Sequence, residues 1–120
     1  MLTVRFVALS YFRLSPSYKS GEQTLLFTAS AASFYHMTFG PMYCGSKHAV
    51  WGFMRSIAKP FYYNDKIRVN SLHPGTVKTP IMEAEAWAPF PQDIFTPVEK
   101  IGETMLLVSL PFECIEAAMR

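Results

Sequence analysis

This 120-residue sequence has no clustered glycines, no closely spaced cysteines and no long apolar runs. The six glycines are dispersed, so no glycine-rich loop can wrap closely around a phosphate group. Two cysteines, Cys44 and Cys114, lie far apart without metal-ligand spacing, which argues against a disulfide framework or a zinc site and favours a reducing, cytoplasmic setting. No segment reaches the roughly 20 apolar residues that a membrane-spanning helix needs.

Charge of either sign is also modest. Eleven Lys and Arg face nine Asp and Glu, which gives a formal net charge of +2. No basic run alternates with aromatic residues, as a nucleic-acid groove requires, so nucleic acid is not an expected partner. Half of the residues are apolar and 17% are charged, and this composition predicts a single folded domain over residues 1–120.

The spacing of apolar residues predicts helices alternating with strands. Helical spacing predicts a helix over residues 3–14 and a second over residues 41–59. Short apolar runs at residues 25–28 and 67–72, without polar alternation, predict strands that are buried on both faces of a parallel sheet. A third helix is expected over residues 97–109.

Prolines and capping residues set the expected ends of these helices. Pro60 is expected to stop the second helix, because a proline inside a helix removes a hydrogen bond and clashes with the preceding turn. Asn64 and Asp65 are then expected to form a turn. Residues 96–99, Thr-Pro-Val-Glu, predict a capping box ahead of the third helix, which Pro111 ends.

The order helix, strand, helix, strand, helix corresponds to half of a doubly wound α/β fold. A buried parallel pair of strands needs neighbours on both sides. The sequence therefore predicts a partial Rossmann-like parallel sheet, which belongs either to a larger sheet or to an obligate oligomer.

Three polar side chains are placed to converge at one edge of this predicted sheet. Tyr43 and Lys47 are one turn apart on one face of the second helix. A neighbouring ammonium favours the phenolate, so Lys47 is expected to lower the pKa of Tyr43 toward a value useful for proton transfer. Ser30 follows the first strand at its carboxyl end, where open α/β sheets bind ligands, and lies thirteen residues before Tyr43.

Four stretches in this order resemble the C-terminal half of the short-chain dehydrogenase/reductase family. They are the Ser30 segment, the Y-x-x-x-K pattern of Tyr43 and Lys47, I-R-V-N at residues 67–70, and P-G-x-V-x-T at residues 74–79. Within the family, residues 43–53 are similar to the 15-hydroxyprostaglandin dehydrogenase branch.

The resemblance implies an NAD(P)-dependent oxidoreductase that interconverts a secondary alcohol and a ketone. It assigns Tyr43 as the acid/base, Lys47 as its helper and as a ligand of the nicotinamide ribose, and Ser30 as a hydrogen-bond donor to the substrate oxygen. No metal is implied. Residues 84–95 correspond to the family's substrate lid. Together with Tyr43 and Lys47, the implied cofactor-binding residues are Pro74, Gly75, Val77 and Thr79.

The family's glycine-rich turn T-G-x-x-x-G-x-G does not occur in this sequence, so the nucleotide-binding N-terminal half is expected to be missing. Neither NAD nor NADP is favoured over the other. An alternative therefore stays open, in which the chain is a truncated, non-catalytic module that only dimerises. In the family the helices at residues 3–14 and 41–59 form the dimer, which implies a homo-oligomer or pairing with a full-length relative.

Overall fold

The computed structural model describes residues 2–80, 83–111 and 114. Helices and strands alternate through this part of the chain, as predicted, and confirm the α/β class. Short 3-10 helices lie in the connections. The elements in chain order are α1 (Leu2–Leu14), β1 (Thr24–Thr28), η1 (Ala31–Ser33), α2 (Pro41–Asp65), β2 (Arg68–Leu72), η2 (Ala84–Trp87), η3 (Gln92–Ile94) and α3 (Val98–Ser109).

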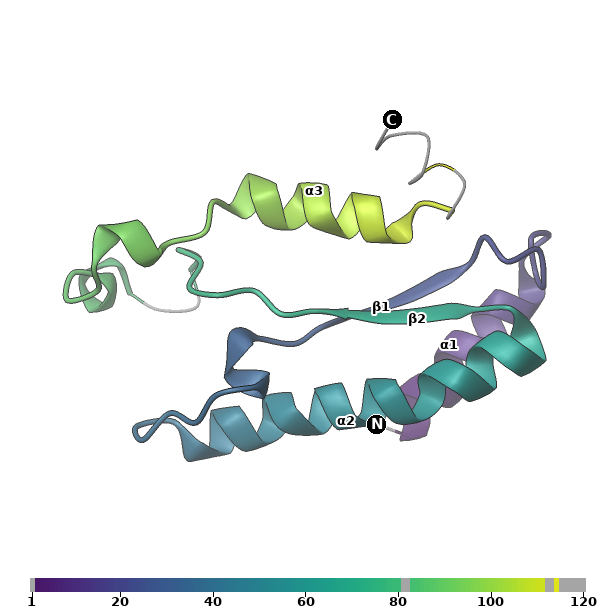
Figure 1. Ribbon diagram of the computed structural model, residues 1–120, viewed down its shortest axis with the longest axis horizontal. Helices are drawn as coiled ribbons and strands as arrows, with labels where there is room; N and C mark the ends of the chain where they lie inside the picture. Colours follow the sequence, from purple (N-terminus) through teal and green to yellow (C-terminus); the bar gives the residue numbers. More distant parts are fainter. Residues whose placement is uncertain (1, 81–82, 112–113, 115–120) are drawn as a thin grey trace.

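The strands β1 and β2 pair in parallel, with Thr24 opposite Arg68 and Thr28 opposite Leu72. Figure 1 shows α1 and α2 on one face of this small sheet and α3 on the other. This is the layering of a doubly wound fold. Because both strands run in the same direction, their carboxyl ends meet at one edge of the sheet, beside η1 and the start of α2 (Figure 1).

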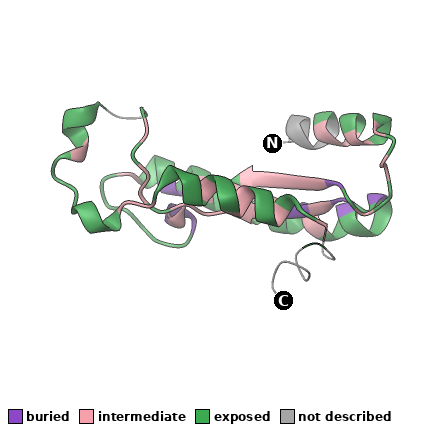
Figure 2. Ribbon diagram, turned by 90° about the horizontal axis from the view of Figure 1, so that it is seen from above, coloured by how far each residue is buried: buried purple, intermediate pink, exposed green. Residues whose placement is uncertain are grey.

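The hydrophobic core lies between the sheet and α2. Phe27 of β1 meets Phe53 of α2 edge to face, with ring centroids 6.0 Å apart. Figure 2 shows that buried residues are few and that most of the described chain is exposed or only half-buried. The centre of the core consists of Ile57, Phe61, Ile67 and Val69.

The prediction that Pro60 ends the second helix is wrong. The helix α2 continues to Asp65, so Asn64 and Asp65 form its last turn, and Lys66 caps it in the left-handed conformation with φ of 58°. Pro60 itself is exposed, whereas Phe61 is only 1% exposed. Burial of Phe61 in the core stabilises these last turns enough to offset the hydrogen bond that Pro60 removes.

Asp65 joins the end of α2 to the end of α1. The Tyr18 hydroxyl donates a hydrogen bond to Asp65 Oδ1, and the Arg13 guanidinium forms an ion pair with the same oxygen at 3.3 Å. Hydrogen bonds with Tyr18 and Asp65 raise the pKa of Arg13 above its ordinary value. Asp65 is buried, and a buried carboxylate needs such partners.

The predicted capping box before α3 is also wrong. The helix begins at Val98 after Pro97, and no side chain caps its first turn. The backbone N–H of Thr96 instead donates to the Thr76 carbonyl oxygen at 2.8 Å, because Phe95 pairs with Thr76 in an isolated parallel bridge. The far end of α3, at Ser109, is as predicted. None of the helices in the described ranges is long and apolar enough to cross a membrane.

Candidate active site

Tyr43 and Lys47 lie in the first turns of α2, and Lys47 contacts the carboxyl end of β1. The ammonium of Lys47 donates a hydrogen bond to the carbonyl oxygen of Thr28, the last residue of β1, at 3.4 Å. Thr28 lies two residues before Ser30 in the chain, so this contact places Lys47 near the Ser30 segment. The predicted catalytic residues thus belong to one edge of the sheet.

Tyr43 and Lys47 are neighbours on one face of α2. Lys47 Nζ lies 5.6 Å from the centroid of the Tyr43 ring, within the range of a cation–π contact. Tyr43 is 46% exposed, so a ligand has access to its hydroxyl group. The pair therefore presents a phenol and a positive charge together at the sheet edge.

Ser30 lies two residues beyond β1 and caps η1. Its backbone is extended, with φ of −167°, and its Oγ accepts a hydrogen bond from the Ala32 N–H at 3.2 Å. A hydroxyl group that accepts through a lone pair keeps its hydrogen for donation. Ser30 is therefore able to donate to an oxygen atom of a ligand.

The predicted cofactor-binding segment, residues 74–79, lies directly beside the Ser30 loop. The Ala29 N–H donates to the Leu72 carbonyl oxygen, and the Ala31 N–H donates to the Pro74 carbonyl oxygen, each at 2.8 Å. These bonds extend the pairing of the two segments past the ends of the strands. The structure therefore brings Pro74 to the same edge as Ser30, and Gly75, Val77 and Thr79 follow Pro74 in the chain.

A hollow of about 670 Å³ lies where this segment leads into η2. One of its lining residues is Thr79, which the family resemblance assigns to the cofactor. The remaining lining residues come from the same stretch of chain: Lys78, Pro80, Glu83, Ala84 and Trp87.

Residues 83–95 contain η2 and η3 and a cluster of three aromatic rings. The centroids of Trp87, Phe90 and Phe95 are 5.7 to 6.4 Å apart. Lys78 lies over this cluster, with Nζ 4.8 Å from the Phe95 centroid, and it donates to Gln92 Oε1 at 2.9 Å. The segment therefore folds back onto the chain beside Thr79.

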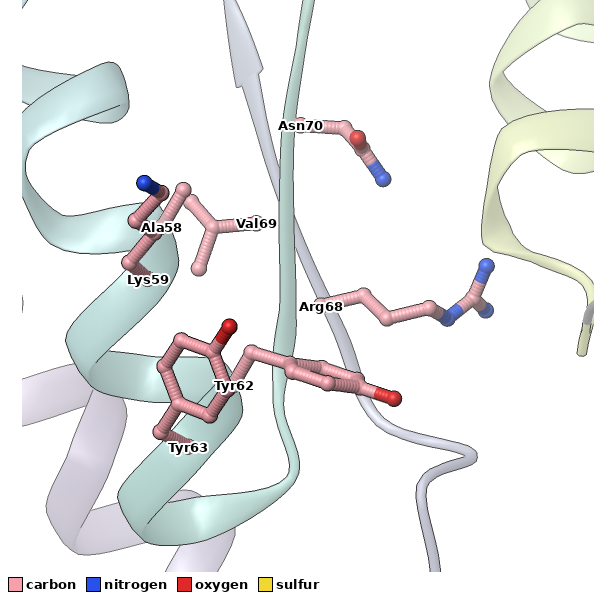
Figure 3. Close-up of a pocket in the computed structure, with 7 residues that line it drawn as sticks. All are labelled: Ala58, Lys59, Tyr62, Tyr63, Arg68, Val69 and Asn70. Carbon is pink, nitrogen blue, oxygen red and sulfur yellow. The ribbon is translucent and has the colours of Figure 1, made fainter.

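A second hollow, of about 440 Å³, lies far from these residues, between the last turns of α2 and the first half of β2 (Figure 3). Arg68, at its rim, reaches toward α3 and donates to the carbonyl oxygen of Ser109 at 3.0 Å. None of the predicted site residues lines this hollow. Its lining residues are Ala58, Lys59, Tyr62, Tyr63, Arg68, Val69 and Asn70.

The residues at the carboxyl edge suit one half of a dinucleotide. Lys47 offers an ammonium and Tyr43 a hydroxyl group that could bind a ribose, and the 74–79 segment offers backbone groups and the Thr79 hydroxyl, which could bind a carboxamide. In the part of the chain that the structure describes, no glycine-rich pyrophosphate loop lies beside them. Gly21, the glycine with a positive φ (86°), lies before β1 at the opposite end of the strand. Over the described residues, no group of three or more His, Cys, Asp or Glu side chains is placed to hold a metal ion.

His73 is absent from the predicted site, yet it contacts the Ser30 loop. Its Nδ1 lies 3.2 Å from the Ser30 carbonyl oxygen, and its Nε2 lies 2.7 Å from Ser71 Oγ. Side chains two residues apart on a strand share a face, so the Ser71-x-His73 spacing in the sequence could have predicted the contact between Ser71 and His73.

The family model described as short chain dehydrogenase matches residues 7–88 of the chain. That range includes β1, α2, β2 and all the predicted site residues. The chain belongs to the short-chain dehydrogenase family.

Curated members of this family are similar to most of the chain. It is 39% identical over 101 residues to short-chain dehydrogenase/reductase prx7 of Penicillium rubens, an alignment that covers 84% of this chain and 35% of the relative. It is 35% identical over 82 residues, 68% of the chain, to 2,5-dichloro-2,5-cyclohexadiene-1,4-diol dehydrogenase of Sphingobium indicum, of which it covers 32%.

A third relative is the hydroxynaphthalene reductase-like protein Arp2 of Metarhizium acridum. It is 39% identical over 69 residues, which are 58% of this chain and 26% of the relative. The chain thus spans about a third or less of the length of these curated relatives. No solved structure matches the chain.

Proposed function

We propose that this chain provides the acid/base edge of an NAD(P)-dependent short-chain dehydrogenase active site, which interconverts a secondary alcohol and a ketone. The observation that carries the proposal is the contact of Lys47, which lies beside Tyr43, with the carboxyl end of β1 near Ser30, in a member of this family. Open α/β sheets bind their ligands at this edge.

Each of the three side chains has a defined task in this proposal. Tyr43 takes a proton from the alcohol or gives one to the ketone oxygen. The ammonium of Lys47, 5.6 Å from the ring, stabilises the negative charge that forms on the Tyr43 oxygen. Ser30 donates a hydrogen bond to the substrate oxygen and so orients it toward Tyr43. Acid/base help of this kind contributes about 10²–10⁴-fold in rate.

The nicotinamide half of the cofactor is held, in this proposal, by the residues of the same edge. Lys47 and Tyr43 would bind the ribose hydroxyls, Pro74, Gly75 and Val77 would line the nicotinamide, and Thr79 would bind its carboxamide. Bound NAD(P) supplies or accepts the hydride. Either nucleotide is compatible with these contacts.

The substrate that we propose is a ring-bearing alcohol or ketone. Two relatives carry names that refer to ring compounds, a cyclohexadiene diol and a hydroxynaphthalene. The indole of Trp87 lines the hollow that Thr79 also lines, and an aromatic wall suits a flat apolar ligand. We further propose, from residues 43–53, a placement near the 15-hydroxyprostaglandin dehydrogenase branch.

Cofactor titration tests the proposed function. Trp51 and Trp87 provide fluorescence, and we expect NADH or NADPH to quench it saturably at micromolar concentration. Lys47→Met should weaken this binding, because it removes the ammonium at the sheet edge. Lys66→Met is the matched control, since Lys66 lies 5.3 Å from the Tyr62 ring at the other end of α2. Absence of binding up to millimolar cofactor would overturn catalysis by this chain.

A non-catalytic pairing module is the second candidate function, favoured by one observation. Val7, Tyr11 and Leu14 lie at helical spacing along one face of α1 and are 49%, 72% and 82% exposed. A second copy of the chain, or a full-length relative, would cover this stripe. Pairing is also compatible with catalysis, so the cofactor titration distinguishes the two candidates.

A further inference from the structure

His73 connects the segment after β2 to the loop that carries Ser30. The backbone of Ser30 is flanked by two hydrogen bonds, from Ala29 to Leu72 and from Ala31 to Pro74, each at 2.8 Å. Pro74 has no backbone N–H to donate in return. Between these two bonds, the side chain of His73 contacts the Ser30 carbonyl oxygen through Nδ1, at 3.2 Å. His73 thus provides a hydrogen-bond donor from the segment after β2.

The partners of the two ring nitrogens define the tautomer of a neutral His73. A carbonyl oxygen only accepts, so the contact with Ser30 requires the hydrogen on Nδ1. Nε2 is then an acceptor, and the hydroxyl of Ser71 donates to it at 2.7 Å. Ser71 lies near the end of β2, two residues before His73, and so ties the imidazole to the strand.

An aromatic ring also packs against the imidazole. The ring of Phe34, which follows η1, lies 4.5 Å from the His73 ring at an interplanar angle of 34°. Trp51 of α2 in turn meets Phe34 edge to face at 4.9 Å. The imidazole is therefore held by the strand, by the Ser30 loop and, through Phe34, by the helix that carries Tyr43 and Lys47.

We propose that His73 is a positioning residue that fixes the Ser30 hydroxyl at the carboxyl edge of the sheet. By holding the Ser30 carbonyl oxygen it sets the backbone at which η1 begins. That backbone in turn places Ser30 Oγ where it accepts the hydrogen bond of the Ala32 N–H, at 3.2 Å, and so caps η1. The catalytic meaning of this placement rests on the proposed function, whereas the placement itself does not.

The test compares two substitutions of His73. His73→Phe keeps a ring against Phe34 but removes the nitrogen that donates. His73→Asn restores a side-chain N–H near the position of Nδ1. Loss of one hydrogen bond predicts about five- to tenfold faster amide hydrogen exchange at Ala32 and Ser33 in the Phe variant, with exchange in β1 unchanged. The Asn variant should return exchange toward the wild-type rate.

The matched control is His48→Phe. His48 Nδ1 also contacts a backbone carbonyl oxygen, that of Cys44 at 2.9 Å, but within α2. This variant should leave exchange at Ala32 and Ser33 unchanged. Two-bond ¹H–¹⁵N spectra of the unmodified chain should show hydrogen on Nδ1 of His73.

Three results would overturn the positioning role: hydrogen on Nε2 in place of Nδ1, unchanged exchange in the Phe variant, or an Asn variant that behaves like the Phe variant. If the Phe variant does not fold, the tautomer of His73 in the unmodified chain and hydrogen exchange in the Asn variant still test the positioning role. Where cofactor binds and turnover is measurable, the Phe variant should lower kcat and leave the dissociation constant for NAD(P)H unchanged. Failure of cofactor binding alone would overturn the proposed function and leave the exchange result intact.

Discussion

At the scale of single residues, the same Tyr-to-Lys spacing occurs twice in or beside α2. Lys47 lies 5.6 Å from the Tyr43 ring, and Lys66 lies 5.3 Å from the Tyr62 ring. The spacing alone therefore does not define a site. What distinguishes the first pair is its place, because Lys47 also reaches the carbonyl oxygen of Thr28 at the carboxyl end of β1.

This duplication supplies a matched test of the acid/base role. Tyr43→Phe removes one hydroxyl group from a ring that is 46% exposed, so we expect the fold to be retained and turnover to fall about 10²–10⁴-fold. Tyr62→Phe makes the same change in a ring that is 48% exposed and should leave turnover unchanged. Equal losses in steady-state kinetics would contradict the assignment of Tyr43.

The sequence predicts where Ser30, Tyr43 and Lys47 lie because each position follows from its own element. Ser30 follows a strand, and a four-residue spacing within a helix places Tyr43 beside Lys47. The contact of His73 with Ser30 is of another kind. It joins residues 43 positions apart and depends on the register of two strands, which composition and periodicity do not give.

At the scale of elements, the order and type of helices and strands follow from hydrophobic spacing, while two boundaries do not. Local rules place the end of α2 at Pro60 and a capping box at Thr96. Burial of Phe61 carries α2 on to Asp65, and the bridge between Thr76 and Phe95 uses the backbone of Thr96 for another bond. In both places a long-range contact outweighs the local preference.

The two prolines of α2 provide a test of this account. Pro60 lies inside the helix, so Pro60→Ala should restore a hydrogen bond and raise the free energy of unfolding by up to about 3 kcal/mol. Pro41→Ala changes the first helical position, where no hydrogen bond is lost, and should alter stability far less. Denaturant unfolding measures both. Destabilisation by Pro60→Ala would show that the proline is needed for the packing of Phe61.

At the scale of the whole molecule, the described chain is flat and more extended than a compact domain. Its radius of gyration is 16.7 Å, and its extents are 48 × 37 × 22 Å. A compact chain of this length has a radius of gyration of roughly 14 Å. With a two-stranded sheet and a small core, it exposes apolar surface. The larger sheet or oligomer expected from the sequence would bury this surface, and it stays a prediction.

The exposed stripe on α1 makes that expectation testable. If copies of the chain pair through Val7, Tyr11 and Leu14, replacing Tyr11 and Leu14 together by Lys places two charges in the interface and should convert a dimer to a monomer. Light scattering after size-exclusion chromatography measures the mass. Leu106→Lys is the control, because Leu106 is 72% exposed on α3, across the sheet from α1 (Figure 1). A dimer that survives the double substitution, or one that Leu106→Lys dissociates, would place the interface away from α1.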